Sequence, residues 1–145
     1  MRVVLDTNVF IAALLVPTGV AALVLKVWSE HGFTLLYSTE LLLELREVMA
    51  RPRLRVRVKR HRVGALIRRI KAHGERVYSN RNAVESVDPK DDFLFAIVQN
   101  GGADYLVSRD IKGVLEMSML GSLTLTPEQL LAMLSRAVGS SDSRI

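Results

Sequence analysis

The chain has 145 residues, of which 49% are hydrophobic and 24% are charged, so it is long enough to bury the core of one globular domain. Its formal net charge of +5 favours anionic partners, and no stretch approaches the roughly 18 consecutive apolar residues that a membrane helix needs. Because the sequence has no cysteine, disulfides, thiolate metal sites and a cysteine nucleophile are excluded, and any metal must bind oxygen or imidazole.

Apolar runs alternate with helical patterns along the whole chain. Strands are predicted at residues 2–5, 33–37, 105–108 and 123–125, with a weaker candidate at 77–78. Capping residues, prolines and glycines delimit helices at about residues 9–15, 20–30, 38–50, 88–99 and 127–137. Strands separated by helices pair through right-handed crossovers into a mostly parallel sheet. We expect an α/β fold with three α/β/α layers and about five strands, one domain over residues 1–138, a flexible tail over residues 139–145, and a cytoplasmic protein.

Positive charge is concentrated in one segment. Residues 51–71 hold ten of the twenty Lys and Arg, and no acid lies between Glu47 and Glu75. A long helical region is predicted here, although the alternation from Arg53 to Val58 also fits a strand. Such charge favours a phosphate polymer, and a solvated helix face is the alternative. The candidate RNA-binding residues are Arg51, Arg53, Arg55, Arg57, Lys59 and Arg60.

Apolar residues within the same segment, such as Ile67, must be buried in the domain or against a second copy, so a homodimer is one expected partner. Trp28 and Tyr78 carry rings that can stack on bases. Aromatic residues at helix or strand positions are more often part of the core, so we assign neither a functional role.

Two acids follow predicted buried strands. Asp6 comes directly after the first strand, and Asp110 lies just past the strand that begins at Tyr105. In an open parallel sheet, ligands bind beyond the carboxyl ends of the strands, so both acids are candidates for a site there. Taken singly, a helix cap explains Asp6 and a turn explains Asp110.

Helical spacing singles out two more acids. Glu44 lies at the edge of the apolar stripe formed by Leu41, Leu45 and Val48, and a salt bridge to a nearby arginine is the alternative explanation. In the segment from residue 88, Asp88, Pro89 and Asp91 suit capping positions. Asp92 belongs to a helix that is apolar nearly all round, and we therefore expect it to point at protein.

Four carboxylates from separate segments would repel one another unless divalent cations neutralised them. Oxygen-only ligands favour Mg²⁺ or Mn²⁺. The three histidines show no metal-ligand spacing with the acids and are predicted to lie on the surface. If Asp6, Glu44, Asp92 and Asp110 converge at the carboxyl edge of the sheet, a metal is therefore implied.

The strand followed by Asp6-Thr7-Asn8, the isolated Glu44, the segment 92–96 and the segment 107–110 together resemble the PIN domain over about residues 2–135. The ending at residues 123–131 is similar to that of a subgroup of VapC-like toxins. The resemblance implies a parallel five-stranded sheet and an acidic pocket of Asp6, Glu44, Asp92 and Asp110 that binds Mg²⁺ or Mn²⁺. It also implies supporting roles for Asn8 and for Ser108, where Thr is more usual.

This resemblance implies a metal-dependent ribonuclease, often the toxin of a pair whose second member is an antitoxin protein. Asp91, next to Asp92, is a competing site candidate. Two other functions stay open. One is a basic RNA- or protein-binding module without catalysis. The other is a phosphatase with an aspartyl nucleophile, which normally requires a second aspartate where this chain has Asn8.

Overall fold

The structure is a computed structural model, and it describes residues 1–78, 92–110 and 123–142. The described elements, in chain order, are β1 (Arg2–Leu5), α1 (Thr7–Leu15), α2 (Val20–Ser29), β2 (Thr34–Tyr37), α3 (Thr39–Met49), α4 (Pro52–Arg55), α5 (Arg60–His73), β3 (Glu75–Arg76), α6 (Asp92–Gly101), β4 (Tyr105–Val107), β5 (Leu123–Leu125) and α8 (Pro127–Asp142). This alternation of strands and helices confirms the predicted α/β class.

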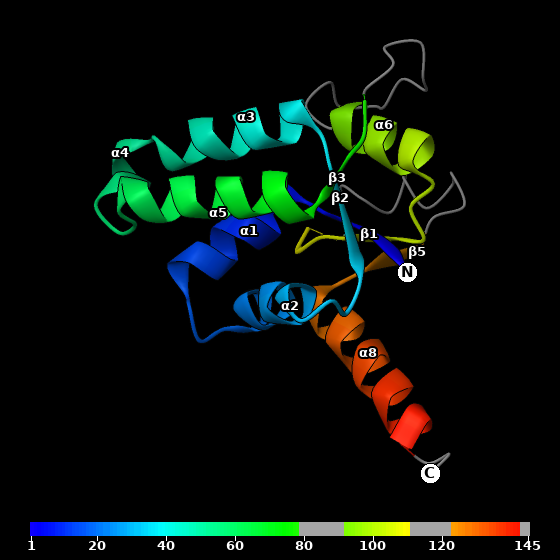
Figure 1. Cartoon of the computed structure of the whole chain (residues 1–145). Helices are drawn as coiled ribbons and strands as arrows, with labels where there is room; N and C mark the ends of the chain where they lie inside the picture. The colour runs from blue at the N-terminus through cyan, green and yellow to red at the C-terminus, as the bar shows by residue number, and fades with distance from the viewer. Residues whose placement is uncertain (79–91, 111–122, 143–145) are drawn as a thin grey trace.

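The five strands form one sheet in the order β3-β2-β1-β4-β5, and every neighbouring pair is parallel. Helices cover both faces, with α6 on one side of the sheet and α2 and α8 on the other (Figure 1). The predicted three-layer α/β/α architecture is therefore correct. No single described helix is long and apolar enough to cross a membrane; α1 and α2 pass that test only as a pair that is bent by 104°.

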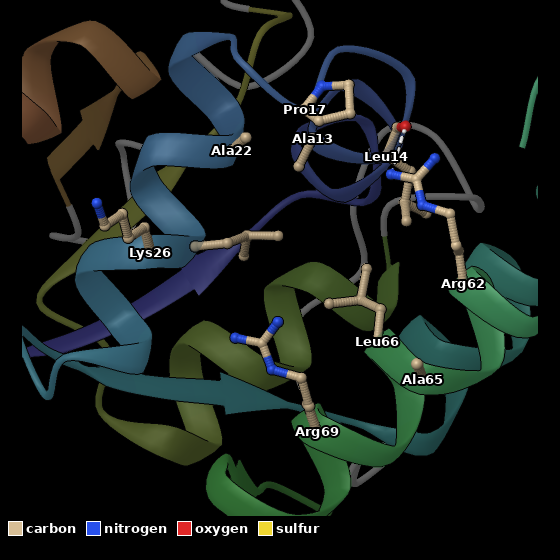
Figure 2. Close-up of a pocket in the computed structure, with 10 residues that line it drawn as sticks. Ala13, Leu14, Pro17, Ala22, Lys26, Arg62, Ala65, Leu66 and Arg69 are labelled. Atoms are coloured by element: carbon tan, nitrogen blue, oxygen red, sulfur yellow. Dashed lines mark hydrogen bonds between the residues drawn. The ribbon is translucent and has the colours of Figure 1, made fainter.

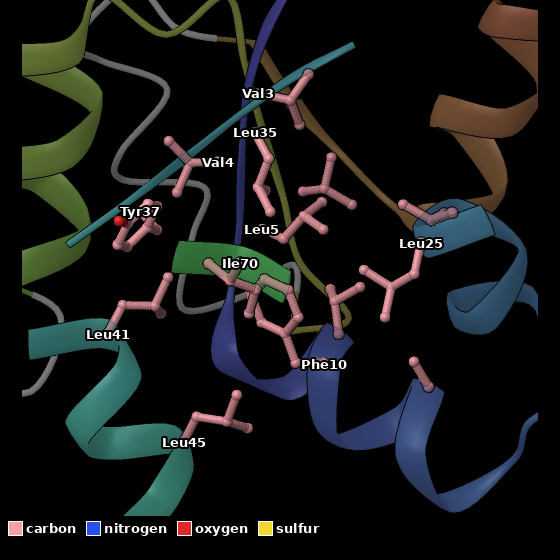
Figure 3. Close-up of a cluster of buried hydrophobic side chains, with 14 of the residues drawn as sticks. Val3, Val4, Leu5, Phe10, Leu25, Leu35, Tyr37, Leu41, Leu45 and Ile70 are labelled. Atoms are coloured by element: carbon pink, nitrogen blue, oxygen red, sulfur yellow. The ribbon is translucent and has the colours of Figure 1, made fainter. Parts of the chain in front are cut away.

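The core is built around the central strand. Val3, Val4 and Leu5 of β1 are fully buried, since helices cover both sides of this strand. Leu35 of β2 and Phe10 of α1 pack into the same cluster (Figure 3). Burying each such side chain contributes about 1.5–3 kcal/mol, so this cluster fixes the position of β1 and of the residues that follow it.

Local signals place the ends of several helices. Ser38 caps α3, because its hydroxyl accepts a hydrogen bond from the backbone N–H of Leu41 at 3.2 Å. At the start of α8, Thr126 and Gln129 form a reciprocal capping box, in which each side chain accepts from the other's backbone N–H, at 3.1 and 2.8 Å. Gly102, at φ +61°, follows α6 in the left-handed conformation that glycine adopts most easily.

The helical region predicted over the basic segment is confirmed as α4 and α5, and the alternative strand from Arg53 to Val58 is not found, because Pro52 starts a helical turn. Two predicted boundaries were wrong. The edge strand β3 covers Glu75–Arg76, just before the predicted residues 77–78. The last helix continues to Asp142 through Gly139, since one glycine costs a helix only about 1 kcal/mol, so residues 139–142 of the predicted tail are helical.

Candidate active site

The ends of two neighbouring strands bring the first site residues together. Leu5 of β1 pairs with Val107 of β4, so Asp6 and Ser108 follow side by side. The backbone N–H of Asp6 donates to the carbonyl of Val107 at 2.8 Å, which extends this pairing by one residue. The carboxyl edge of the sheet, predicted from the sequence as the position of the site, thus carries Asp6 and Ser108.

Ser108 is the centre of a hydrogen-bond network at this edge. Its side chain is fully buried, and its hydroxyl donates to Oδ2 of Asp6 at 2.8 Å. The hydroxyl oxygen of Ser108 also accepts from Nδ2 of Asn8 at 3.2 Å and from the backbone N–H of Asp110 at 3.0 Å. One donor and two acceptor positions are all that a hydroxyl offers, so Ser108 is fully satisfied and holds three site residues in place.

Asn8 completes the network from α1. Its Nδ2 donates to Oδ2 of Asp6 as well as to Ser108, each at 3.2 Å. Its Oδ1 accepts from the backbone N–H of Arg109 at 3.1 Å. Since both ends of the amide are engaged, Asn8 links the start of α1 to the loop after β4.

Asp6 is held in an environment that disfavours its charge. Burial of the carboxyl group raises its pKa above the ordinary value of 3.8, and the nearby carboxylate of Asp110 raises it further. The hydroxyl of Ser108 and the backbone N–H groups of Thr7 and Asn8 lower the pKa, but they do not outweigh burial. Asp6 occupies the N-cap position of α1, where no side-chain hydrogen bond of capping geometry is found, and its side-chain partners are Ser108 and Asn8.

Glu44 reaches the same region from α3. It is half-buried, whereas Glu40 and Glu47 on the same helix are exposed, as its position beside the apolar stripe predicted. The hydroxyl of the buried Thr7 donates to Oε2 of Glu44 at 2.5 Å. Thr7 follows Asp6 directly, so this hydrogen bond links Glu44 to the segment that carries Asp6. Among the described residues, Glu44 forms this hydrogen bond and not the salt bridge to an arginine that was the alternative explanation from the sequence.

The model of the PIN domain matches residues 2–112 of the chain, which is well over half of its length. The chain belongs to the PIN domain family. PIN domains are generally nucleases that act on nucleic acid and use divalent metals. A comparison with curated proteins gave no match.

This PIN domain therefore brings Asp6, Asn8, Ser108 and Asp110 into one network, with Glu44 linked through Thr7. The backbone of Asp92 begins α6, but its side chain and the whole of Asp91 lie outside the described residues. Among the residues that the structure does describe, no three acids or histidines are grouped closely enough to hold a metal ion.

Sequence reasoning missed the role of Thr7. The sequence pattern predicts no role of its own for Thr7, whereas its hydroxyl is the partner of Glu44. A polar side chain between the buried strand and the apolar face of α1 was the available signal, because a buried hydroxyl needs a partner. Tyr78 was also misjudged, since its side chain is 72% exposed, whereas Trp28 is buried as expected.

The predicted basic residues are on the surface. Arg51, Arg53, Arg55, Arg57, Lys59 and Arg60 are all exposed. The apolar residues of the same segment mostly pack within the domain, and Val56, at 85% exposure, is the clear exception. The need for a second copy to cover them is correspondingly small, and the homodimer stays a prediction.

A hollow of about 350 Å³ between α1, α2 and α5 is separate from the acids (Figure 2). Its walls are mainly apolar, and its cations are Lys26, Arg62 and Arg69. Arg62 donates to the carbonyl of Leu14 at 3.1 Å. Among the described side chains, no candidate acid lines this hollow, so the carboxyl edge of the sheet remains the candidate active site.

Proposed function

We propose that this PIN domain is a metal-dependent ribonuclease that hydrolyses phosphodiester bonds in RNA. The observation that carries the proposal is Asp6, a half-buried carboxylate whose pKa is raised and whose orientation is fixed by Ser108 and Asn8. Holding a charge in such surroundings costs stability, which is typical of functional sites. Asp110 lies close enough to increase that cost.

The donor set suits a hard divalent cation. Asp6 and Asp110 offer carboxylate oxygens, which Mg²⁺ and Mn²⁺ prefer, and a cation would relieve the repulsion between them. Within the described part of the chain, the side chains of Asn8 and Ser108 both donate to Oδ2 of Asp6, and no side chain donates to its Oδ1. We propose Asp6, Glu44, Asp92 and Asp110 as the residues that hold the cation.

A bound divalent cation supplies activation of water and neutralises charge on the phosphate. The chain itself supplies orientation. Ser108 and Asn8 fix the carboxylate of Asp6, and Thr7 fixes that of Glu44, so the acids are arranged before substrate binds. A carboxylate of this cluster accepts the proton of the attacking water.

We propose further that the protein is a cytoplasmic VapC-like toxin that is paired with an antitoxin protein. The support is the resemblance of residues 123–131, where the described capping box of Thr126 and Gln129 starts α8. The exposed cations from Arg51 to Arg60 suit contacts with RNA phosphates.

Cleavage of a labelled mixture of single-stranded RNAs, with Mn²⁺, Mg²⁺ or EDTA, tests the proposal. Wild type is expected to cleave only with metal, and Asp6→Asn and Glu44→Gln are expected to lose activity. Glu47→Gln is the matched control, because Glu47 lies one turn from Glu44 and is exposed. Cleavage that persists in EDTA, or that survives Asp6→Asn, contradicts the proposal. No cleavage under any condition favours a binding module.

A further inference from the structure

Two hollows lie along the seam between α3 and α5, which run side by side and are joined by α4 (Figure 1). The hollow near the sheet has a volume of about 440 Å³, and its cations are Arg46, Lys71 and Arg76. The hollow near α4 has a volume of about 410 Å³, and its cations are Arg46, Arg55 and Arg60. Because Arg46 lines both, the two hollows adjoin, and we call the surface that carries these five cations the α3/α5 track.

The track has the charge of a polyanion site. None of the described residues that line the two hollows is an acid. The side chains of four of its five cations form no hydrogen bond or ion pair within the described part of the chain, and that of the fifth, Arg76, contacts an aromatic ring. The cations on the opposite face of α5 differ, because Arg62 bonds the carbonyl of Leu14 and Arg69 lies over the ring of Trp28.

An exposed aromatic ring lies beside the track. The guanidinium of Arg76 lies 4.7 Å from the centroid of the Tyr78 ring, which is 72% exposed. Asn100 holds the backbone at this point by donating to the carbonyl of Tyr78 at 3.1 Å. Glu75, the acid nearest in sequence, is paired with Arg2. The exposed ring of Tyr78 thus lies next to the guanidinium of Arg76, and its backbone is held by Asn100.

We infer that the α3/α5 track and Tyr78 bind single-stranded RNA. Phosphates lie along the cations, and an unpaired base stacks on the ring of Tyr78. An aromatic platform beside a cationic groove is how single strands are bound, because an unpaired base exposes its face and a paired base does not. The inference deepens the proposed function and rests on it for the choice of RNA as the polyanion.

The track is separate from Asp6, Glu44 and Asp110, the described acids of the candidate active site. Thr39, Leu42 and Arg46 line the hollow near the sheet and share one face of α3. Glu44 precedes Arg46 by two residues, which is about 200° around a helix, and it faces Thr7 instead. The track therefore holds a part of the RNA away from the bond that is cleaved, and its loss weakens binding without disturbing the chemistry.

Only some of the cations in the basic segment belong to the track. Of the six cations predicted from the sequence, Arg55 and Arg60 line the track. Arg51, Arg53, Arg57 and Lys59 line neither hollow. The cations expected to bind RNA are therefore identified by their position in the fold and not by the density of positive charge along the chain.

The test measures the binding of a fluorescent 20-nucleotide single-stranded RNA, in EDTA and at several salt concentrations, with every variant made in an Asp6→Asn background. Arg46→Ala with Lys71→Ala removes two track cations. Lys26→Ala with Arg136→Ala, on α2 and α8, removes the same charge elsewhere. We expect the track pair to weaken binding and to lower the salt slope by about 1.4, which is two single-strand phosphate contacts, and the control pair to leave the slope unchanged.

Stacking is tested by Tyr78→Ala and Tyr78→Phe. The alanine variant is expected to bind the single strand roughly 5- to 150-fold more weakly, and phenylalanine to bind like the parent, because it keeps the ring. Equal salt slopes for the track and control pairs, unchanged binding by Tyr78→Ala, or equal affinity for a duplex each overturn the inference. Arg55→Ala with Arg60→Ala, at the other end of the track, replaces the first pair if that pair fails to fold.

The RNA-binding test and the cleavage assay can fail independently of each other. If wild type cleaves no RNA but the track variants lose binding, the proposed nuclease is wrong and the track stands. If wild type cleaves RNA and the track variants bind as the parent does, the track is wrong and the nuclease stands.

Discussion

The hydroxyl of Ser108 is the most informative single group to remove. Ser108→Ala deletes a hydrogen bond to the carboxylate of Asp6 and leaves the Nδ2 of Asn8 and the backbone N–H of Asp110 each without one partner. A hydrogen bond to a charged group contributes about 1.5–3 kcal/mol. Because the side chain is fully buried, water does not readily replace what is lost. We expect the free energy of unfolding to fall by about 2–3 kcal/mol at neutral pH.

Chemical and thermal unfolding in EDTA measure this change. For a domain of this length, the expected loss corresponds to a fall in Tm of about 5–10 °C. Ser135→Ala is the matched control, since Ser135 lies exposed on α8, and it is expected to change stability by less than about 0.5 kcal/mol. The same Ser108→Ala change should also raise the pKa of Asp6 further, because the lost hydroxyl favours the ionised form.

A double-mutant cycle separates the charged hydrogen bond from simple packing. In an Asp6→Asn background the acceptor is neutral, so Ser108→Ala should cost about 1 kcal/mol less than it does in wild type. Equal costs in both backgrounds would refute the reasoning, as would a loss in the single variant no larger than that of Ser135→Ala.

Three further predictions follow from the same geometry. Asp6→Asn should raise the free energy of unfolding of the metal-free protein at neutral pH. Because the pKa of Asp6 is higher in the folded than in the unfolded protein, ionising this carboxyl group costs stability at high pH. Denaturant titrations across pH should therefore show the gain vanish as the pH falls to 3.8, the ordinary pKa of the group. Thr7→Val keeps the shape but removes the donor to Glu44, and should lower stability by about 1–3 kcal/mol in denaturant unfolding, whereas an unchanged midpoint would show that Glu44 does not depend on this contact. Gly64→Ala should raise Tm by stabilising α5 by about 0.5–1 kcal/mol, because an added Cβ has only a flexible arginine side chain within 4 Å, and a lower Tm would contradict that account.

Much of the architecture was predictable because local patterns are read directly from the chain. The central strand is apolar from Val3 to Leu5, and the residues after it begin a helix, so Asp6 had to lie at a carboxyl end of the sheet. Helical spacing alone separated Glu44 from Glu40 and Glu47. These inferences depend only on the period of an element and on the side of the sheet at which parallel strands end.

Contacts between distant elements could not be predicted in this way. The hydrogen bond from Thr7 to Glu44 depends on how α3 packs against α1, which neither helix encodes alone. The division of the basic segment depends on the seam between α3 and α5. Tyr78 was expected in the core because aromatic residues in strands usually are buried, but alternate residues of an extended segment point to opposite sides, and here Val77 is the buried one.

The proposed nuclease activity depends most directly on whether the acids at the carboxyl edge bind a divalent cation. Calorimetric titration of Mn²⁺ into the metal-free protein, wild type beside Asp6→Asn and Glu47→Gln, tests this without knowledge of the RNA target. We predict saturable binding to wild type and Glu47→Gln, accompanied by a rise in Tm, and loss of both in Asp6→Asn. Absence of binding to wild type, or equal binding to Asp6→Asn, would contradict the assignment of this site as the metal centre of a nuclease.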